Sequence, residues 1–485
     1  MSNLASTPGS SDPISTAFFD IDAFLAQEES KDLLRLTTAG SVDDGKSTLI
    51  GRLLHDAKGA YEDQLKSAIR GGEIDFALLT DGLRAEREQG ITIDVAYRYF
   101  ATPKRKFILA DTPGHEQYTR NMATGASTAD LVIILLDAHR GMTVQSRRHG
   151  FIAALLGIPH FVIAVNKMDL VGYDEAVFRR IHDEYKGYLD SLGVKDAYFL
   201  PLSALKGDNV VEAGSHMPWF HGPCLLDHLE SVDTSNKLQH APFRMAVQRV
   251  SRPDQNFRGF AGQIGSGTVK PGDTVRALPS GRRTKVTRVV TFDGDLKVAH
   301  APMSVTLTLA DEIDISRGDM IASGSEPQTA RAFEATVVWF DGHALDPAHD
   351  YLIKHTSQTI PAKIEKVKHL IALRKDIAKI EQEPASSLSM NEIGVVRIST
   401  ARPLFFDPYK ENRSTGSFIL IDRKTNATAG AGMILGAVEG SAESGQDRLA
   451  RLVRAAFAED ARLDLPPDDT QAVEVLRELL KGILK

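Results

Sequence analysis

The residues with the clearest chemical potential lie near the start of this 485-residue chain and match the pattern G-x-x-x-x-G-K-[ST]. An apolar run, Leu33 to Ala39, precedes them, and a stretch of helical periodicity, Ser47 to Leu54, follows them. In that context, backbone N–H groups of the loop surround phosphate oxygens, the lysine donates to the β and γ phosphates, and the serine hydroxyl binds Mg²⁺. The pattern predicts a phosphate-binding loop formed by Gly40, Ser41, Val42, Asp43, Asp44, Gly45, Lys46, Ser47 and Thr48.

A second motif, Asp111-Thr112-Pro113-Gly114, closes another apolar run. We expect Asp111 to hold Mg²⁺ through water and the Gly114 N–H to meet the terminal phosphate. Alone, such a tetrapeptide is an ordinary turn. His115 follows at once, where its side chain can orient an attacking water, because in-line phosphoryl transfer depends on positioning and charge stabilisation. His115 is therefore the candidate catalytic residue, and an unspecialised surface histidine is the alternative.

A third motif predicts which base is bound. Asn166, Lys167, Met168 and Asp169 follow the apolar run Phe161 to Val165. The Asp169 carboxylate can accept hydrogen bonds from guanine N1–H and the 2-amino group, and adenine offers neither donor. Such a site rejects the wrong base by about 10⁴-fold, since its buried polar groups would go unpaired. The prediction is GTP and not ATP, with the base pocket completed by Ser203, Ala204 and Leu205.

Between the first two motifs lies a segment that the order of motifs marks as a switch. We expect Thr92 to complete the Mg²⁺ ligands, with Ser47 and Asp111, when the γ-phosphate is present and to release them after hydrolysis. The alternative is a solvated helix that leads into a strand. The predicted switch residues are Gly90, Ile91, Thr92 and Ile93.

Continuous apolar runs alternate with longer amphipathic stretches around these motifs, which is typical of a parallel sheet covered on both faces. From Pro242 the period becomes that of antiparallel strands with recurrent turn signals, as in Val305 to Leu309. The predicted fold is an α/β P-loop GTPase domain followed by two small antiparallel β-barrel domains and a helical C-terminal tail. The expected boundaries are a leader 1–30, the GTPase domain 31–235, barrels 240–327 and 328–438, and the tail 439–485.

Composition excludes several classes of protein. A formal net charge of −7 leaves no basic excess for bulk nucleic-acid or anionic-membrane binding, so neither partner is expected. The single cysteine, Cys224, allows no intrachain disulfide, and we expect it to be a buried spectator. The first thirty residues contain no Lys or Arg, which argues against a targeting signal. We expect a cytoplasmic protein. The basic run Lys104 to Lys106 reads as a hairpin tip in water.

The complete motif set resembles the translation-factor family of GTPases, and more specifically the GTPase subunit of bacterial sulfate adenylyltransferase. The resemblance extends from about residue 20 to 437, and its most specific part is the block Arg87 to Phe100. It is also carried by Gly40 to Leu54, Ile74 to Leu79, His115 to Asp130, Asn256 to Gly259 and Asn412 to Met433. Asp44 departs from the histidine usual in elongation factors, which favours the sulfate-activating branch.

The resemblance implies that GTP hydrolysis on this chain is coupled to adenylyl transfer from ATP to sulfate on a smaller catalytic subunit. The products would be adenosine 5'-phosphosulfate and diphosphate, the cofactors GTP and Mg²⁺, and the assembly a heterodimer or larger. Because the chain ends in a helical tail, a C-terminal kinase domain is not expected. The competing hypotheses are an elongation-factor-like GTPase that binds tRNA and a regulatory GTPase whose barrels bind a partner.

Overall fold

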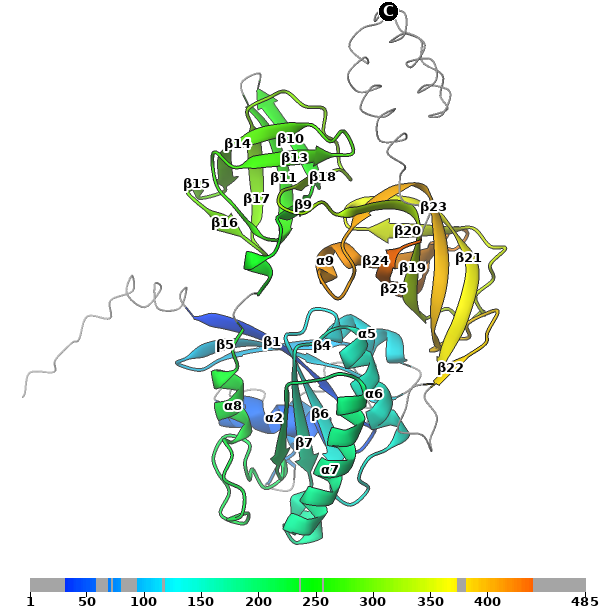
Figure 1. The fold of residues 1–485 in the computed structure, drawn as a ribbon. Coiled ribbons are helices and arrows are strands. Elements are labelled where there is room, and N and C mark those ends of the chain that lie inside the picture. Colours follow the sequence, from blue (N-terminus) through cyan, green and yellow to red (C-terminus); the bar gives the residue numbers. More distant parts are fainter. Residues whose placement is uncertain are drawn as a thin grey trace, which may run out of the picture.

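Three compact units follow one another in a computed structural model of the chain (Figure 1). It describes residues 31–57, 69–70, 73–79, 94–115, 118–234, 237–254, 257–372 and 381–438. The first unit is a sheet with helices on both faces, and the other two are antiparallel barrels. The predicted fold class is thereby confirmed for the described units, whereas the leader and the helical tail fall outside the described residues.

The sheet of the first unit has the strand order β4-β5-β1-β6-β7-β8. Strand β4 is antiparallel to β5, and the remaining neighbours are parallel. Every residue of β6 is buried, as expected for a central strand covered on both faces. The strands are β1 (Asp32–Ala39), β4 (Ala96–Ala101), β5 (Arg105–Asp111), β6 (Leu131–Asp137), β7 (His160–Asn166) and β8 (Ala197–Pro201).

Helices connect the parallel strands and cover the sheet, since a parallel crossover needs an intervening element. Helix α6 begins at a capping box in which the Thr143 hydroxyl accepts from the Ser146 N–H at 3.0 Å. No helix in the described part of the chain is long and apolar enough to cross a membrane. The helices are α2 (Lys46–Asp56), α5 (Thr119–Ala126), α6 (Val144–Leu155), α7 (Glu175–Ser191) and α8 (Leu225–Ser231).

Short elements complete the first unit: β2 (Ile69–Arg70) pairs with β3 (Glu73–Ile74), and one-turn 3-10 helices form at η1 (Phe76–Leu79), η3 (Met168–Val171) and, beyond α8, η4 (Lys237–His240).

The second unit is a barrel of six antiparallel strands in the order β11-β17-β14-β13-β18-β9, closed by pairing of β9 with β11. Its core contains Phe260, Ile264 and Leu307. The strands are β9 (Arg244–Ala246), β10 (Arg249–Asp254), β11 (Phe257–Ser266), β12 (Thr268–Val269), β13 (Thr274–Leu278), β14 (Arg283–Thr291), β15 (Gly294–Leu296), β16 (Ala299–His300), β17 (Ser304–Leu309) and β18 (Met320–Ala322).

The third unit is a barrel of six strands in the order β20-β24-β25-β19-β23-β21, closed by pairing of β20 with β21. Closure leaves no unpaired edge within the ring. Its elements are β19 (Gln328–Trp339), β20 (Tyr351–His355), β21 (Gln358–Ala372), β22 (Glu381–Glu383), β23 (Ile393–Phe406), α9 (Arg413–Gly416), β24 (Ser417–Asp422) and β25 (Thr428–Ala437).

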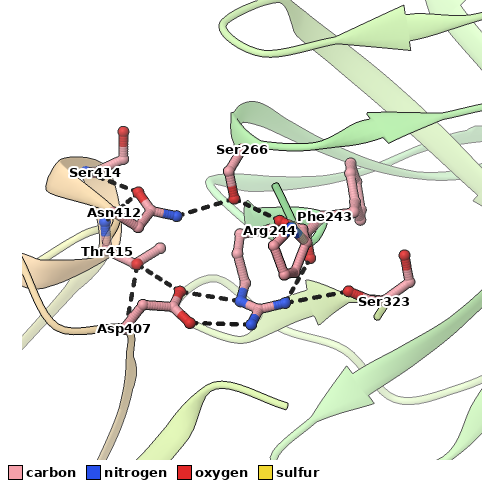
Figure 2. Close-up of polar contacts among 9 residues, drawn as sticks. Phe243, Arg244, Ser266, Ser323, Asp407, Asn412, Ser414 and Thr415 are labelled. Carbon is pink, nitrogen blue, oxygen red and sulfur yellow. Dashed lines mark hydrogen bonds and ion pairs between the residues drawn. The ribbon is translucent and has the colours of Figure 1, made fainter. Parts of the chain in front are cut away.

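The connection from β23 to β24 joins the two barrels. Figure 2 shows Arg244 of the first barrel in a bidentate ion pair with Asp407 of the second, with both N···O distances 3.0 Å. Asn412 Nδ2 donates to Ser266 Oγ at 2.9 Å, and Thr415 Oγ1 donates to Asp407 at 2.8 Å. The guanidinium of Arg244 is buried, so the pair is screened little by solvent.

The same connection contacts the first unit. Tyr409 Oη donates to the Leu156 carbonyl at 3.0 Å. Arg413 donates to the carbonyls of Ser127 and Ala129, at 3.3 and 3.2 Å, where helix α5 ends. A positive side chain is favourable at a helix C-terminus. Residues 407–416 therefore hydrogen-bond to all three units.

The basic run Lys104 to Lys106 does lie at a hairpin, between β4 and β5, and Lys104 is exposed. The expectation is wrong for Arg105, which is buried: its Nη1 donates to the Leu229 carbonyl at 3.0 Å and to the Val232 carbonyl at 2.7 Å. These carbonyls end helix α8, and a guanidinium has enough donors to serve both. Cys224 is buried as expected, and burial raises the pKa of its thiol to about 11.

Candidate functional site

The phosphate-binding motif forms the turn between β1 and α2, at the carboxyl edge of the sheet. Gly45 has φ of 91°, a left-handed conformation that glycine adopts without strain. A Cβ there would lie 2.4 Å from Asn166 Nδ2, which itself donates to the Asp44 carbonyl at 2.8 Å. The close approach of the base-recognition motif to this loop therefore requires glycine at position 45.

Two charged side chains are buried in this loop. Lys46 Nζ donates to the carbonyls of Gly40 and Ser41, both at 2.9 Å, and burial lowers its pKa, opposed by the charges of Asp111 and Asp44. Burial raises the pKa of Asp44, opposed chiefly by the hydrogen bond that its carboxylate accepts from the Ser41 N–H at 2.6 Å. The ammonium has three donors, so it is able to serve phosphate oxygens from the same position.

Asp111 ends strand β5, and the parallel register sets it beside Thr38 of β1. The Thr38 hydroxyl donates to Asp111 Oδ1 at 3.4 Å, and both residues are buried. Among the described residues no three His, Cys, Asp or Glu side chains gather as a metal cluster. A single carboxylate, together with the hydroxyl predicted at Ser47, would suit Mg²⁺, which keeps several waters and is completed by phosphate oxygens.

Gly114 lies against the phosphate loop. A Cβ on it would lie 2.4 Å from Lys46 Nζ and 2.7 Å from the Gly40 carbonyl oxygen. Helix α6 contacts the same turn, where Gln145 Nε2 donates to the Gly114 carbonyl at 3.3 Å. Ser41 Oγ of the loop also lies 2.9 Å from Thr143 Oγ1. Sequence reasoning missed Thr143 and Gln145, because they belong to no motif.

The residues predicted to recognise the base meet at the carboxyl ends of β7 and β8. Ser203 Oγ donates to Asp169 Oδ1 at 2.6 Å, which leaves the second oxygen of the carboxylate for another donor. Asn166 joins three segments, since its Oδ1 also accepts from the Ala204 N–H at 2.9 Å. Arg52 of α2 donates to the carbonyls of Ala204 and Leu205 at 3.2 and 2.5 Å. Hydrogen bonds of Asn166 and Arg52 thus connect the Ser203–Leu205 segment to the phosphate loop and to helix α2, which follows that loop.

Lys167 and Met168 take different places in this pocket. Met168 is buried, whereas Lys167 has φ of 63° and its Nζ donates to Asp137 Oδ2 at 2.8 Å. Burial alone would raise the pKa of Asp137, but the hydrogen bond from Lys167 and the His139 N–H hold it below its usual value. The Lys167 ammonium is thereby held by Asp137. Asp137, another residue missed from sequence, lies beside Asn166 in the β6–β7 register.

The remaining predicted residues are placed only in part. His115 is exposed, and its ring meets that of Tyr118 edge-on at a centroid distance of 6.1 Å. The predicted switch, Gly90 to Ile93, lies outside the described residues. The geometry of the described motifs defines a P-loop GTPase of the translation-factor type, in which the phosphate loop, the Asp111–Gly114 turn and the residues predicted to bind the base share one sheet edge.

Comparisons with known proteins agree with this class. The family described as "Elongation factor Tu GTP binding domain" matches residues 31–241, and "GTP-eEF1A C-terminal domain-like" matches residues 332–435. Sulfate adenylyltransferase subunit 1 of Alteromonas mediterranea is 52% identical over 433 residues, covering 87% of this chain and 91% of the relative. That of Bacteroides thetaiotaomicron is 51% identical over 476 residues, covering 95% and 97%. The chain belongs to the sulfate adenylyltransferase subunit 1 family.

Longer relatives also match. The bifunctional enzyme NodQ of a Rhizobium species is 55% identical over 421 residues, and this chain spans 65% of its length. The bifunctional enzyme CysN/CysC of Rhodopirellula baltica is 53% identical over 427 residues, again with 65% of its length spanned.

Proposed function

We propose that this chain binds and hydrolyses GTP as the GTPase subunit of a sulfate adenylyltransferase. GTP hydrolysis here would drive the formation of adenosine 5'-phosphosulfate and diphosphate from ATP and sulfate on a smaller partner subunit. The observation that carries the proposal is the identity of 52% to a subunit 1 relative of which 91% is covered. The expected cytoplasmic location is part of the same proposal.

Each part of the site has a role in this proposal. Gly40 to Thr48 hold the phosphates, with Lys46 neutralising charge on the β and γ groups. Ser47, Asp111 through water and, from the switch, Thr92 would hold Mg²⁺, which would neutralise charge on the transferred phosphoryl group. Asp169 and the pocket of Asn166 and Ser203 select guanine.

His115 is proposed to orient the attacking water. His115 directly follows the Asp111–Gly114 turn and is exposed, so its ring lies outside the core. A positioning role requires no change in the protonation of the ring, since phosphoryl transfer needs an aligned nucleophile more than a strong base. The residue is thus the proposed catalytic group of this chain.

A second candidate is a translation GTPase that binds tRNA, because the domain family is shared with elongation factor Tu. The net charge of −7 opposes it, since binding to a phosphate backbone is driven by Lys and Arg. Binding of aminoacyl-tRNA in the GTP state, with no effect on adenosine 5'-phosphosulfate formation, would favour this candidate.

The direct test is GTP turnover by the full chain mixed with a sulfate adenylyltransferase catalytic subunit. Turnover is measured with ATP and sulfate together and with each omitted in turn. We expect the rate to rise only when both are present. A GTP turnover rate that does not change with sulfate would support the alternative of a regulatory GTPase whose barrels bind another partner.

A further inference from the structure

A hydrogen-bonded pair on helix α6 contacts the Asp111–Gly114 turn beside the phosphate loop. Gln145 Nε2 lies 3.3 Å from the Gly114 carbonyl oxygen and 3.0 Å from His149 Nε2. The two residues are four positions apart and share one face of the helix. His149 is buried, and Gln145 is half-buried. The amide therefore bridges a buried imidazole and the peptide that joins Gly114 to His115.

The hydrogen-bonding capacity of these groups fixes their protonation. Gln145 has two N–H donors, one for the Gly114 carbonyl and one for His149 Nε2, which accepts only when the imidazole is neutral and protonated at Nδ1. The opposite amide orientation would set Gln145 Oε1 against the Gly114 carbonyl, two acceptors together. Burial lowers the pKa of His149 to about 3, and the charges of Lys46 and Arg148 act in the same direction. The neutral acceptor form therefore prevails at neutral pH.

This arrangement carries an energetic cost. Among the described residues, Nδ1 of His149 has no hydrogen-bond partner, although it is buried. An unsatisfied buried donor destabilises the folded state, because it gives up its hydrogen bond to water and gains none in return. An apolar side chain of similar volume would avoid that cost. The presence of histidine is accounted for by the one hydrogen bond that it does make, through Nε2 to Gln145.

We propose that Gln145 and His149 are positioning residues for GTP hydrolysis, which act through the Gly114–His115 peptide. By holding the Gly114 carbonyl from α6, they orient the backbone from which His115 projects and the peptide N–H that Gly114 would offer to the terminal phosphate. Neither side chain touches the nucleotide in this role. The inference rests on the proposed GTPase activity and adds to it the second layer of residues that holds the turn.

The test is single-turnover GTP hydrolysis by the full chain with Mg²⁺, together with GTP and GDP binding and the midpoint of unfolding. His149→Leu removes the acceptor and the unpaired donor together. We expect hydrolysis to slow by roughly ten- to a hundredfold, with GDP binding unchanged and the unfolding midpoint not lowered. His149→Gln offers an oxygen close to the position of Nε2 and restores most of the rate.

Gln145→Met breaks the same chain of hydrogen bonds at Gln145, which is half-buried. We expect it to slow hydrolysis as much as His149→Leu does. Since the two residues act in series, the double variant should lose no more than either single variant, whereas independent structural defects would add. The matched control is Tyr185→Phe, which removes a buried hydrogen bond of 2.8 Å from Tyr185 Oη to the Ser146 carbonyl on the same helix. It should leave the hydrolysis rate unchanged.

The outcomes separate this inference from the proposed function. A wild-type chain that hydrolyses no GTP contradicts the proposed function. An active wild type with an equally active His149→Leu variant contradicts the positioning role alone. The role is also refuted if His149→Gln is as slow as His149→Leu, or if Tyr185→Phe slows hydrolysis to the same extent.

Discussion

Replacing Asp169 by Asn should move the nucleotide preference from guanine to xanthine. In the wild type, one carboxylate oxygen accepts the Ser203 hydroxyl at 2.6 Å and the other is left for the base. In the variant, the amide oxygen keeps the Ser203 bond, so that the amide N–H₂ faces the base. That group repels the guanine N1–H and 2-amino donors, and it matches the carbonyl that xanthine carries at position 2.

The magnitude follows from the two hydrogen bonds that guanine loses. Each bond to a charged acceptor contributes about 1.5–3 kcal/mol. Losing both weakens GDP binding by roughly 10²- to 10⁴-fold. The assay is competition between GDP and XDP for a fluorescent guanine nucleotide, with Ser203→Ala as the control. Ser203→Ala removes the orienting hydroxyl but keeps the carboxylate, so it should weaken GDP binding without favouring XDP. Asp169→Asn binding GDP as tightly as the wild type would refute the assignment of the pocket.

Three further variants test the site and the barrel interface. Gly114→Ala should slow GTP hydrolysis by roughly a hundredfold, because the added Cβ would lie 2.4 Å from Lys46 Nζ. The control is Gly187→Ala, whose added Cβ would have nothing within 4 Å, and it should leave the hydrolysis rate unchanged. Asp407→Ala should lower the free energy of unfolding, measured in urea, by about 3–5 kcal/mol, because it leaves the buried Arg244 without its carboxylate partner. The double variant Arg244→Met, Asp407→Leu should recover most of that loss. If it does not, the ion pair is not the source of the loss. Asp44→Asn should stabilise the nucleotide-free chain at pH 7, because burial raises the pKa of Asp44 and so penalises the folded carboxylate above that pKa. The gain in stability should vanish when the pH is below 3.8, the ordinary pKa of the carboxyl, because the carboxyl is then neutral in both the folded and the unfolded state. An equal gain in unfolding free energy at pH 7 and below pH 3.8 would contradict this cause.

The strands and motifs of the first unit were predictable from sequence because each signal is local. Apolar runs such as Leu131 to Leu136 become fully buried strands, and a glycine loop between a strand and a helix has few other uses. The barrels were predictable for the same reason, since alternation as in Val305 to Leu309 depends on the strand alone.

What could not be predicted depends on contacts between distant segments. Arg105 reads as exposed from its basic neighbours, but the end of α8, more than a hundred residues away, surrounds it. Arg244 and Asp407 are unremarkable polar residues until two barrels bring them together. Gln145 and His149 carry no motif, and their relation to Gly114 appears only when α6 packs beside the turn. Periodicity and spacing hold no information about such contacts.

The central claim is that the free energy of GTP hydrolysis reaches sulfate activation. The most direct measurement is the amount of adenosine 5'-phosphosulfate that accumulates when this chain and the catalytic subunit are incubated with ATP, sulfate and either GTP or a non-hydrolysable GTP analogue. We predict that GTP raises the product above its equilibrium level with ATP and sulfate alone, and that the analogue does not. The same final level with both nucleotides would contradict the proposed coupling.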